Sequence, residues 1–423
     1  MKNILQAWTK YADIQRDYFK GPFADKAMSF SKEIAQSLVN EDYPIGEDWK
    51  YVNYGQLPKI NLHWPEYTDQ TQQVADNEFL SIEVTNFSNP EEAKVGPCPD
   101  GLTILTPLQA LEAGKLNINP RDFNFDNPFF KLTESFWGQG LFFEFNENYK
   151  NEKPIKIEFK MDQMKSKDFL CSYNLHFVSY SSNKPQVFIE YDGVSFKGLS
   201  NITTTVEVSK NSSLEIFSKE MGGVFGHFIL NLFANVERDA HFRHIDMTFP
   251  SLWSRHNSDV RLLDSGAHVD LFGAYFDDKD NFTDHHTVIR HLKGNTTSHE
   301  DYRGILTGKA KAVFNGKILI DEKASQSNSE QLNKNLMLSK TAEVNTKPEL
   351  QIYNDDVKAA HGATVGQLDE EQKFYLQSRG YSEDKAKEIL AKAFVFDLLE
   401  SSSDKVKDFY MPNIEQTLNQ FEV

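Results

Sequence analysis

The sequence predicts a mainly β protein in which helical segments lie on both sides of a long β-rich core. From about residue 136 to residue 346, short apolar alternations such as LFFEF, IKIEF, HFVSY and QVFIEY recur, separated by Gly, Asn, Asp and Ser. Alternation with a period of two is typical of strands, and a stretch of this length without a helical period indicates an all-β domain. Sandwich, barrel and parallel β-helix architectures all fit the pattern, and strand spacing does not decide among them. Asn315-Gly316 has the chemistry of a two-residue hairpin turn.

Residues 1–135 are expected to form a mostly helical N-terminal domain. An amphipathic segment opens the chain, and a second helix fits Ala24 to Asn40. A third helix is marked at both ends, since Thr106 can cap it, Pro107 suits its first turn and Gly114 can end it.

Residues 347–423 are expected to form a C-terminal helical domain. The polar and small residues from Asp355 to Gly366 follow neither a helical nor a strand period, so this stretch predicts a structured loop. A helix then begins, because Asp369 can cap it and Gly380 can take the left-handed position after its end.

A further helix is predicted from Ser382 to Glu400, and a final short one around Ile414 and Leu418. The first of these carries an apolar stripe that includes Leu390 and Phe394. Such a stripe at helical spacing is more often intramolecular core than a surface for a partner.

Charge and hydropathy exclude several classes of function. The chain has 423 residues and a formal net charge of −17. It has no run rich in Lys or Arg that could replace the counterions of a nucleic acid, so we expect no nucleic-acid partner. The acidity repels anionic membranes, and no apolar run approaches the roughly twenty residues that span a bilayer. Because the N-terminus differs from a secretory signal, we expect a cytoplasmic protein.

The cysteines and glycines give little support for catalysis. Only Cys98 and Cys171 are present, which excludes a disulfide framework and a four-thiolate cluster site within one chain. The glycine–lysine pair within Gly304–Ala310 lacks the spacing and the final Ser or Thr of a phosphate-binding loop. We therefore expect no nucleotide hydrolysis by this chain and no enzyme activity of its own.

Seven of the twelve histidines fall between His241 and His291. Asp284, His285 and His286, together with His291, could suggest a transition-metal site, because imidazole and carboxylate suit iron or zinc. Successive residues of a strand point to opposite faces, however, so His285 and His286 cannot both bind one ion without a bulge. This argues against a metal site made by these residues.

Several motifs together resemble the SufB/SufD family. The segment from Asp355 to Tyr381, DDVKAAHGATVGQLDEEQKFYLQSRGY, carries much of the resemblance. Further motifs follow the family pattern in order: EDWKYVN, NPFFKLTESFWGQGLFFEF, TDHHTVIRHLKGNTTSHEDYRGIL, AKAVFNGKILID and NSEQLNKNLMLSK. The resemblance covers most of the chain. The SufB branch has a cysteine in the helix that follows the polar loop of this segment, where this chain has Leu376, so the SufD branch is favoured.

The resemblance implies a right-handed parallel β-helix at residues 136–346, flanked by the N-terminal and C-terminal helical domains, which could cap its ends. It also implies a non-catalytic scaffold subunit of a SufBCD complex for iron–sulfur cluster assembly. Such a subunit pairs with a SufB-like subunit and docks the ATPase SufC on its C-terminal helices, here in part through Leu390 and Phe394. A homodimer is compatible with the resemblance when the partner is missing.

His361 is the cluster ligand that the resemblance suggests. In SufD-like proteins the matching histidine faces a cysteine of SufB, and histidine is a known ligand of some iron–sulfur clusters. The resemblance therefore implies a transient cluster that is shared with SufB, and no cluster bound tightly by this chain alone. The residues leave open whether the isolated chain binds a cluster or a flavin. Many SufD-type sequences have a cysteine just before this histidine, where this chain has Ala359 and Ala360. Any metal site here must rely on His361 and on the partner.

A β-helix carbohydrate-active enzyme is the alternative function. Such an enzyme needs two carboxylates that face one groove and act as acid and base. Asp264, Asp270, Asp277 and Asp278 are the candidates, although any acidic surface supplies carboxylates. The enzyme predicts a strand-lined cleft with a carboxylate pair, whereas the scaffold predicts helical docking surfaces and a lone histidine near the C-terminal junction.

Overall fold

The computed structural model describes residues 29, 32, 71–74, 76, 78–85, 98–116, 128–136, 138–150, 153–160, 168–194, 197–223 and 226–421. The helix predicted from Ala24 to Asn40 lies outside these residues except for two positions, and the opening amphipathic segment and the EDWKYVN motif lie outside them entirely.

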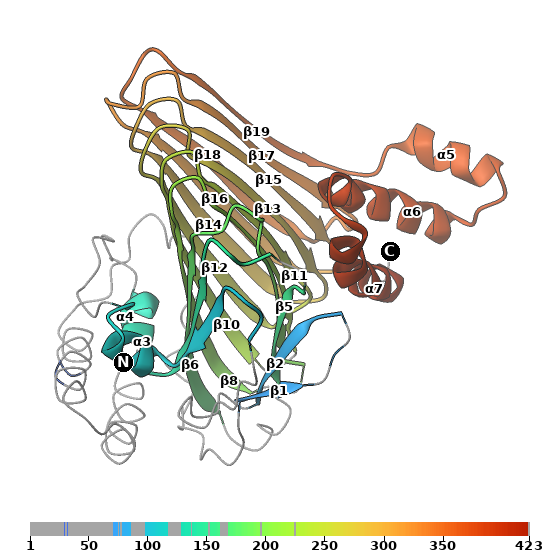
Figure 1. Cartoon of the computed structure of the whole chain (residues 1–423). Coiled ribbons are helices and arrows are strands. Elements are labelled where there is room, and N and C mark those ends of the chain that lie inside the picture. Colours follow the sequence, from blue (N-terminus) through green and yellow to red (C-terminus); the bar gives the residue numbers. More distant parts are fainter. Residues whose placement is uncertain are drawn as a thin grey trace.

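Two sheets of long strands face each other along the described chain (Figure 1). The nine-stranded sheet has the order β18-β16-β14-β12-β10-β8-β6-β4-β3, and the ten-stranded sheet has the order β1-β2-β5-β7-β9-β11-β13-β15-β17-β19. From β4 onward, strands alternate between the sheets, and from β6 onward each pairs in parallel with the strand two before it. This is a parallel β-solenoid, so the predicted β-helix is confirmed, while its right-handed winding stays a prediction.

The strands of the nine-stranded sheet are β3 (Leu102–Leu105), β4 (Gly140–Phe145), β6 (Phe169–Ser179), β8 (Gly198–Val208), β10 (Gly226–Val236), β12 (Trp253–Leu262), β14 (Phe282–His291), β16 (Lys311–Ile320) and β18 (Glu343–Ile352). Those of the ten-stranded sheet are β1 (Thr71–Val74), β2 (Leu80–Thr85), β5 (Ile155–Lys160), β7 (Gln186–Asp192), β9 (Ser213–Met221), β11 (His241–Thr248), β13 (His268–Asp277), β15 (Thr297–Leu306), β17 (Asn328–Met337) and β19 (Lys358–Gly366).

The interior between the sheets is built from side chains that stack turn upon turn. Val260 of β12 lies beside Ile289 of β14, Ile289 lies beside Ile318 of β16, and Ile318 lies beside Leu350 of β18. All four belong to one apolar core. A slip of one residue would turn such a row to the outer face, so burial fixes the register.

Helices cover the outer face of the ten-stranded sheet. They are α6 (Glu383–Phe396), the 3₁₀ turn η4 (Asp397–Leu399) and α7 (Asp404–Gln420). Apolar side chains of α6 and α7 form a second core with residues of β7, β9, β11, β13, β15 and β17. Tyr410 is buried there, and its hydroxyl donates to the carbonyl oxygens of Ser218 and Ile245 at 3.1 and 2.8 Å. These helices therefore lie along the side of the solenoid (Figure 1).

The predicted helix at Thr106–Gly114 is confirmed as α3 (Pro107–Glu112). The Thr106 side chain accepts from the Gln109 backbone N–H, the Gln109 side chain accepts from the Thr106 backbone N–H, and Pro107 occupies the first turn. Gly114 follows the helix with a φ of +68°, which glycine adopts easily.

The described part of residues 1–135 does not confirm a mostly helical domain. Besides α3 it holds only one other described helix of appreciable length, α4 (Pro128–Ser135), which packs against β6 and β8. It also holds β1, β2 and β3, and β2 pairs in parallel with β5 as part of the solenoid. The strands β1 to β3 lie outside the helices predicted for this region, and pairing with other strands holds them in the two sheets.

The sheets also continue past residue 346, since β18 ends at Ile352 and β19 at Gly366. The helix α5 (Glu370–Ser378) follows β19 and reaches away from the sheets (Figure 1). The expectation that the C-terminal helices could cap the end of the solenoid is wrong in this respect, because α6 and α7 use their apolar side chains on the lateral face.

Candidate functional site

The last turn of the solenoid is uncovered within the described chain. β18 and β19 are the outermost strands of their sheets, and each pairs with one strand only. Every residue of β18 and β19 is exposed or half-buried, whereas β15 and β16 are largely buried. The free edge of a long strand presents unpaired N–H and C=O groups, and such groups can pair with the strand of another chain.

His361 lies in β19, and this corrects the prediction of a loop at Asp355–Gly366. Pairing with β17 sets Gln331 beside His361 and Ser329 beside Ala359. The small residues of this stretch carry no strand period of their own, so tertiary hydrogen bonding to β17 decides the structure.

The side chain of His361 stands on the interior side of the uncovered end. Ala359 packs against the interior core, and residues two apart on a strand share a face. His361 therefore continues an interior row formed by Glu300 and Gln331, in which the Gln331 amide donates to Glu300 at 2.6 Å. Burial raises the pKa of Glu300 to about 7, whereas His361 above it is exposed.

No side-chain hydrogen bond of His361 is formed within the described residues. A histidine with a purely structural role would hydrogen-bond to nearby backbone groups. An exposed imidazole over a polar row is instead free to bind an incoming group, since a neutral imidazole offers one nitrogen lone pair to a metal.

This chain brings no thiol to His361. Ala359 and Ala360 precede it on β19, and Cys171 is fully buried in β6. Burial raises the pKa of Cys171 well above its usual value and also raises that of the half-buried Cys98. Both thiols are therefore held in the protonated form, which is a poor nucleophile and a poor metal ligand.

The C-terminal helices place Leu390 and Phe394 on α6. Phe394 is half-buried and packs against the core that α6 and α7 share with the sheet, and the guanidinium of Arg303 lies 5.6 Å from its ring centre. Leu390 is also half-buried. One side of the predicted stripe is thus used within the chain, as expected for most amphipathic helices.

The helix α5 leaves large aromatic side chains in solvent. Asp369 caps it by accepting from the backbone N–H groups of Glu371 and Gln372, as predicted, and Gly380 has a φ of +93° just after it. No residue of α5 is buried, and Phe374 is 70% exposed. Exposed aromatic side chains on a projecting helix are typical of a surface that a partner covers.

His285 and His286 point to opposite faces of β14, as predicted. His285 is buried inside the solenoid, whereas His286 lies on the outer side, 3.0 Å from Asp284. These two residues do not form one metal site.

Inside the solenoid, His256 bridges two buried carboxylates. Its Nδ1 contacts Asp246, and its Nε2 lies 2.7 Å from Glu220. Burial opposes the charged imidazolium, but the two carboxylates outweigh it and raise the pKa of His256 to about 10. Asp246, His256 and His285 have ligand atoms within 4.8 Å of one another, but both nitrogens of His256 are occupied, so this is a structural network.

The four carboxylates considered for a glycosidase do not share a groove. Asp277 is fully buried inside the solenoid, and burial raises its pKa to about 8. Asp264 pairs with Arg238 at 2.9 Å, and Asp270 is held by histidines. This arrangement offers no acid and base pair across a substrate.

Sequence reasoning missed the buried ionic network because its members lie on three strands. Glu220 and Asp246 lie on the neighbouring strands β9 and β11, and His256 comes from β12 of the facing sheet, so only the arrangement of both sheets could have revealed the network. Among the described residues, no helix has the length and the apolar character needed to cross a membrane.

Comparison with known proteins identifies the family of this chain. The family described as "SUF system FeS cluster assembly, SufBD core domain" matches residues 164–394. The iron–sulfur cluster assembly protein SufD of Escherichia coli K12 is 38% identical over 165 residues, 39% of each chain. An iron–sulfur cluster assembly SufBD family protein of Synechocystis is 31% identical over 201 residues, 47% of this chain and 44% of the relative.

A SufBD family protein of Mycobacterium leprae is 31% identical over 170 residues, 38% of this chain and 43% of the relative. In these alignments the chain spans about two fifths of the length of each relative. The family match covers more than half of the chain and includes the strands from β6 to β19. The chain belongs to the SufBD core family of the SUF iron–sulfur cluster assembly system.

Proposed function

We propose that this chain is a non-catalytic scaffold subunit for iron–sulfur cluster assembly, which pairs with a SufB-like subunit and docks a SufC-like ATPase. The uncovered last turn of the solenoid, with His361 on its interior side, is the observation that carries the proposal. The names of the relatives from Escherichia coli and Synechocystis support the assembly role.

The SufB-like subunit would pair with the edge strands β18 and β19. Both edges lie at the same end of the solenoid, and the large apolar side chains of Ile352, Tyr353 and Val365 are exposed there. A second solenoid ending in similar strands would satisfy the free backbone groups by extending both sheets and would bury these side chains.

His361 would ligate a nascent cluster across that interface. The imidazole supplies one nitrogen, and the thiolates come from the partner, because Ala359 and Ala360 supply none. Mixed histidine and cysteine ligation is known for iron–sulfur clusters. The cluster is therefore shared and transient, and no tightly bound cofactor is assigned to this chain alone.

The ATPase would dock on the C-terminal helices. Leu390 and Phe394 keep part of their surface exposed on α6, and the exposed Phe374 and Tyr375 of α5 extend the apolar contact. ATP turnover is left to that partner, because Gly304 lies within β15 and Gly308 in the turn after it, so the glycine–lysine pair does not open a helix.

Co-expression with SufB and SufC, followed by mass measurement of the intact assembly, tests the proposal. We expect one complex that contains all three proteins, and a homodimer of this chain is the expected species when SufB is omitted. Finding this chain only as a monomer in the presence of both partners would contradict the scaffold role.

His361→Ala tests the ligand role within that complex. We expect reduced cluster formation with intact assembly and ATPase activity, because removing one exposed side chain costs little stability. Thr364→Ala is the matched control, since Thr364 is exposed on the same strand but has the opposite side-chain direction. Equal cluster content in the two variants would refute ligation by His361.

A further inference from the structure

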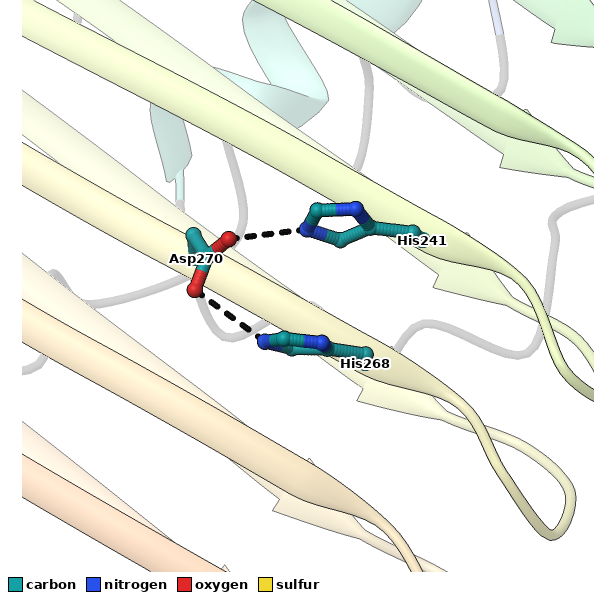
Figure 2. Close-up of side chains that lie close together, drawn as sticks. All are labelled: His241, His268 and Asp270. Atoms are coloured by element: carbon teal, nitrogen blue, oxygen red, sulfur yellow. Dashed lines mark hydrogen bonds and ion pairs between the residues drawn. The ribbon is translucent and has the colours of Figure 1, made fainter. Parts of the chain in front are cut away.

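Three histidines and one aspartate meet on the outer face of the ten-stranded sheet, at the beginnings of β11, β13 and β15. Figure 2 shows the rings of His241 and His268 on one side of the Asp270 carboxylate. His241 Nε2 lies 2.8 Å from one carboxylate oxygen, and His268 Nε2 lies 3.1 Å from the other. His299 Nδ1 lies 3.1 Å from the oxygen that His268 contacts.

The parallel register of the solenoid holds these side chains together. His241 of β11 is paired with His268 of β13, and Asp270 of β13 is paired with His299 of β15. Residues two apart on a strand share a face, so Asp270 lies on the same side as His268. The rings of His241 and His268 stack with their centres 4.4 Å apart. Three rigid turns therefore supply all four groups.

We propose that His241, His268, Asp270 and His299 form a binding site for a divalent transition ion of the zinc class. Three imidazole nitrogens and one carboxylate oxygen suit zinc and its first-row neighbours, whereas magnesium and calcium prefer sites made of oxygen alone. The site is separate from the proposed cluster site at His361, and it does not depend on the scaffold function.

The distances among His241, His268 and Asp270 fit the ligand spacing of a metal ion, and His299 contacts the same carboxylate. Ligand atoms of His241, His268 and Asp270 lie within 4.8 Å of one another. Bonds of about 2.0 Å in a tetrahedral zinc site place neighbouring ligand atoms about 3.3 Å apart. The observed separations of 2.8 to 3.1 Å between Asp270 oxygens and the three nitrogens are close to that value. His299 must turn towards the other two histidines to become the fourth ligand, because His241, His268 and Asp270 alone already lie within 4.8 Å of one another.

The site is open to solvent and carries the charge that a cation needs. The exposed fractions of the side chains are 30% for His241, 34% for His268, 39% for His299 and 16% for Asp270. Burial alone would raise the pKa of Asp270, but the hydrogen bonds with the three histidines outweigh it and hold that pKa far below its usual value. The carboxylate is therefore ionised at neutral pH.

Two neighbouring charges act on the site. Arg243 is paired with Asp270 in the register of β11 and β13, but its guanidinium donates to the Ser402 hydroxyl at 2.9 Å and lies 5.8 Å from the ring centre of Phe272. Glu330 of β17 is paired with His299 and adds a negative charge on the other side. The arginine is thus held by other groups, and the glutamate favours a cation.

Metal binding would exchange protons for the ion. A neutral imidazole that donates its N–H to Asp270 gives that nitrogen to the metal, and its proton moves to the other ring nitrogen through water. A histidine that carries a proton on both ring nitrogens would release one proton to solvent on binding, because an imidazole binds a metal in its neutral form.

Zinc titration of the full chain tests the site. The affinity tag is removed, the protein is treated with a chelator, and Zn²⁺ binding is measured by calorimetry, with Co²⁺ absorption as a report on four-coordinate geometry and Mg²⁺ as the oxygen-preferring control. We expect one zinc site in the natural sequence and at least about 10-fold weaker zinc binding in His268→Ala and His299→Ala. A loss of about 10-fold is the lower end of what is seen even when a residue that only orients a metal ligand is removed.

Asp264→Asn is the matched control for Asp270→Asn. Asp264 is an exposed aspartate that pairs with Arg238 and has no histidine partner, so zinc binding should be unchanged in that variant. Chelator-treated variants are first compared by thermal unfolding. If a histidine variant does not fold, the zinc affinity of Asp270→Asn, which keeps the side-chain shape, is the test, and we expect it to be weakened. Unaltered zinc affinity in the folded variants, or no zinc binding by the natural sequence at micromolar concentration, would overturn the proposal.

Discussion

The lateral face and the end of the solenoid are built from the same kind of strand but are finished differently. Along the side of the ten-stranded sheet, α6 and α7 cover the apolar residues of six strands. At the end, β18 and β19 keep free edges and exposed side chains. The chain therefore covers its own sheet laterally, whereas its described last turn is left uncovered.

The packing of α6 and α7 on the side of the ten-stranded sheet should be essential for the stability of the fold. Tyr410→Ala removes a buried ring and leaves the carbonyl oxygens of Ser218 and Ile245 without its hydroxyl, so we expect the free energy of unfolding to fall by about 3 to 5 kcal/mol. Phe374→Ala, at the exposed helix α5, should change it by no more than about 0.5 kcal/mol. Chemical denaturation of both variants measures the difference, and equal losses would show that α7 does not seal the sheet.

The sealed interior should make stability depend on pH through Asp277. Its unfolded-state pKa is near 3.8, and burial raises the folded-state pKa to about 8. The stability that protonated Asp277 contributes is therefore complete below pH 3.8 and is lost as the pH rises towards 8.

Asp277→Asn keeps the neutral form at every pH and removes this loss. Relative to the natural sequence, we expect the variant to gain about 3 kcal/mol of unfolding free energy between pH 5 and pH 7. Urea denaturation at several pH values measures this, with the neighbouring Asp278→Asn as the control. A stability difference that does not change with pH would mean that Asp277 is ionised in the folded chain.

A charge introduced at the uncovered end should leave the free chain stable but weaken binding of the partner. Val365 on β19 is 53% exposed, and Val194, after β7, is 57% exposed. Val365→Asp and Val194→Asp should each leave the free energy of unfolding within about 0.5 kcal/mol of its natural value. Only Val365→Asp should weaken binding of a SufB-like subunit, by at least about 10-fold, because it buries an unpaired charge. Equal binding by both variants would place the interface elsewhere.

Local chemistry could be predicted from the sequence, because it depends on neighbours along the chain. The capping residues Thr106 and Asp369 and the left-handed Gly380 needed no knowledge of the fold. The strand alternation that separates His285 from His286 was equally local. The core of stacked strands followed from the same alternation, although its β-helical form came from the family resemblance.

Contacts between turns could not be predicted, because they depend on register. Gly316 has the local chemistry of a hairpin turn but lies inside β16, where an added Cβ would come within 2.5 Å of the Gln331 amide nitrogen. The small residues of β19 follow no strand period, so the sequence alone predicts a loop there. The cluster around Asp270 joins residues that are about thirty positions apart, and no spacing rule marks them without the pairing of β11, β13 and β15.

Hydrogen–deuterium exchange of the free chain and of its complex with a SufB-like subunit tests the central claim most directly. We predict that backbone amides of β18 and β19 exchange rapidly in the free chain and become protected in the complex, while the amides of α7 are protected in both states. Unchanged exchange of β18 and β19 in a stable complex, with new protection on another surface, would contradict pairing through the last turn.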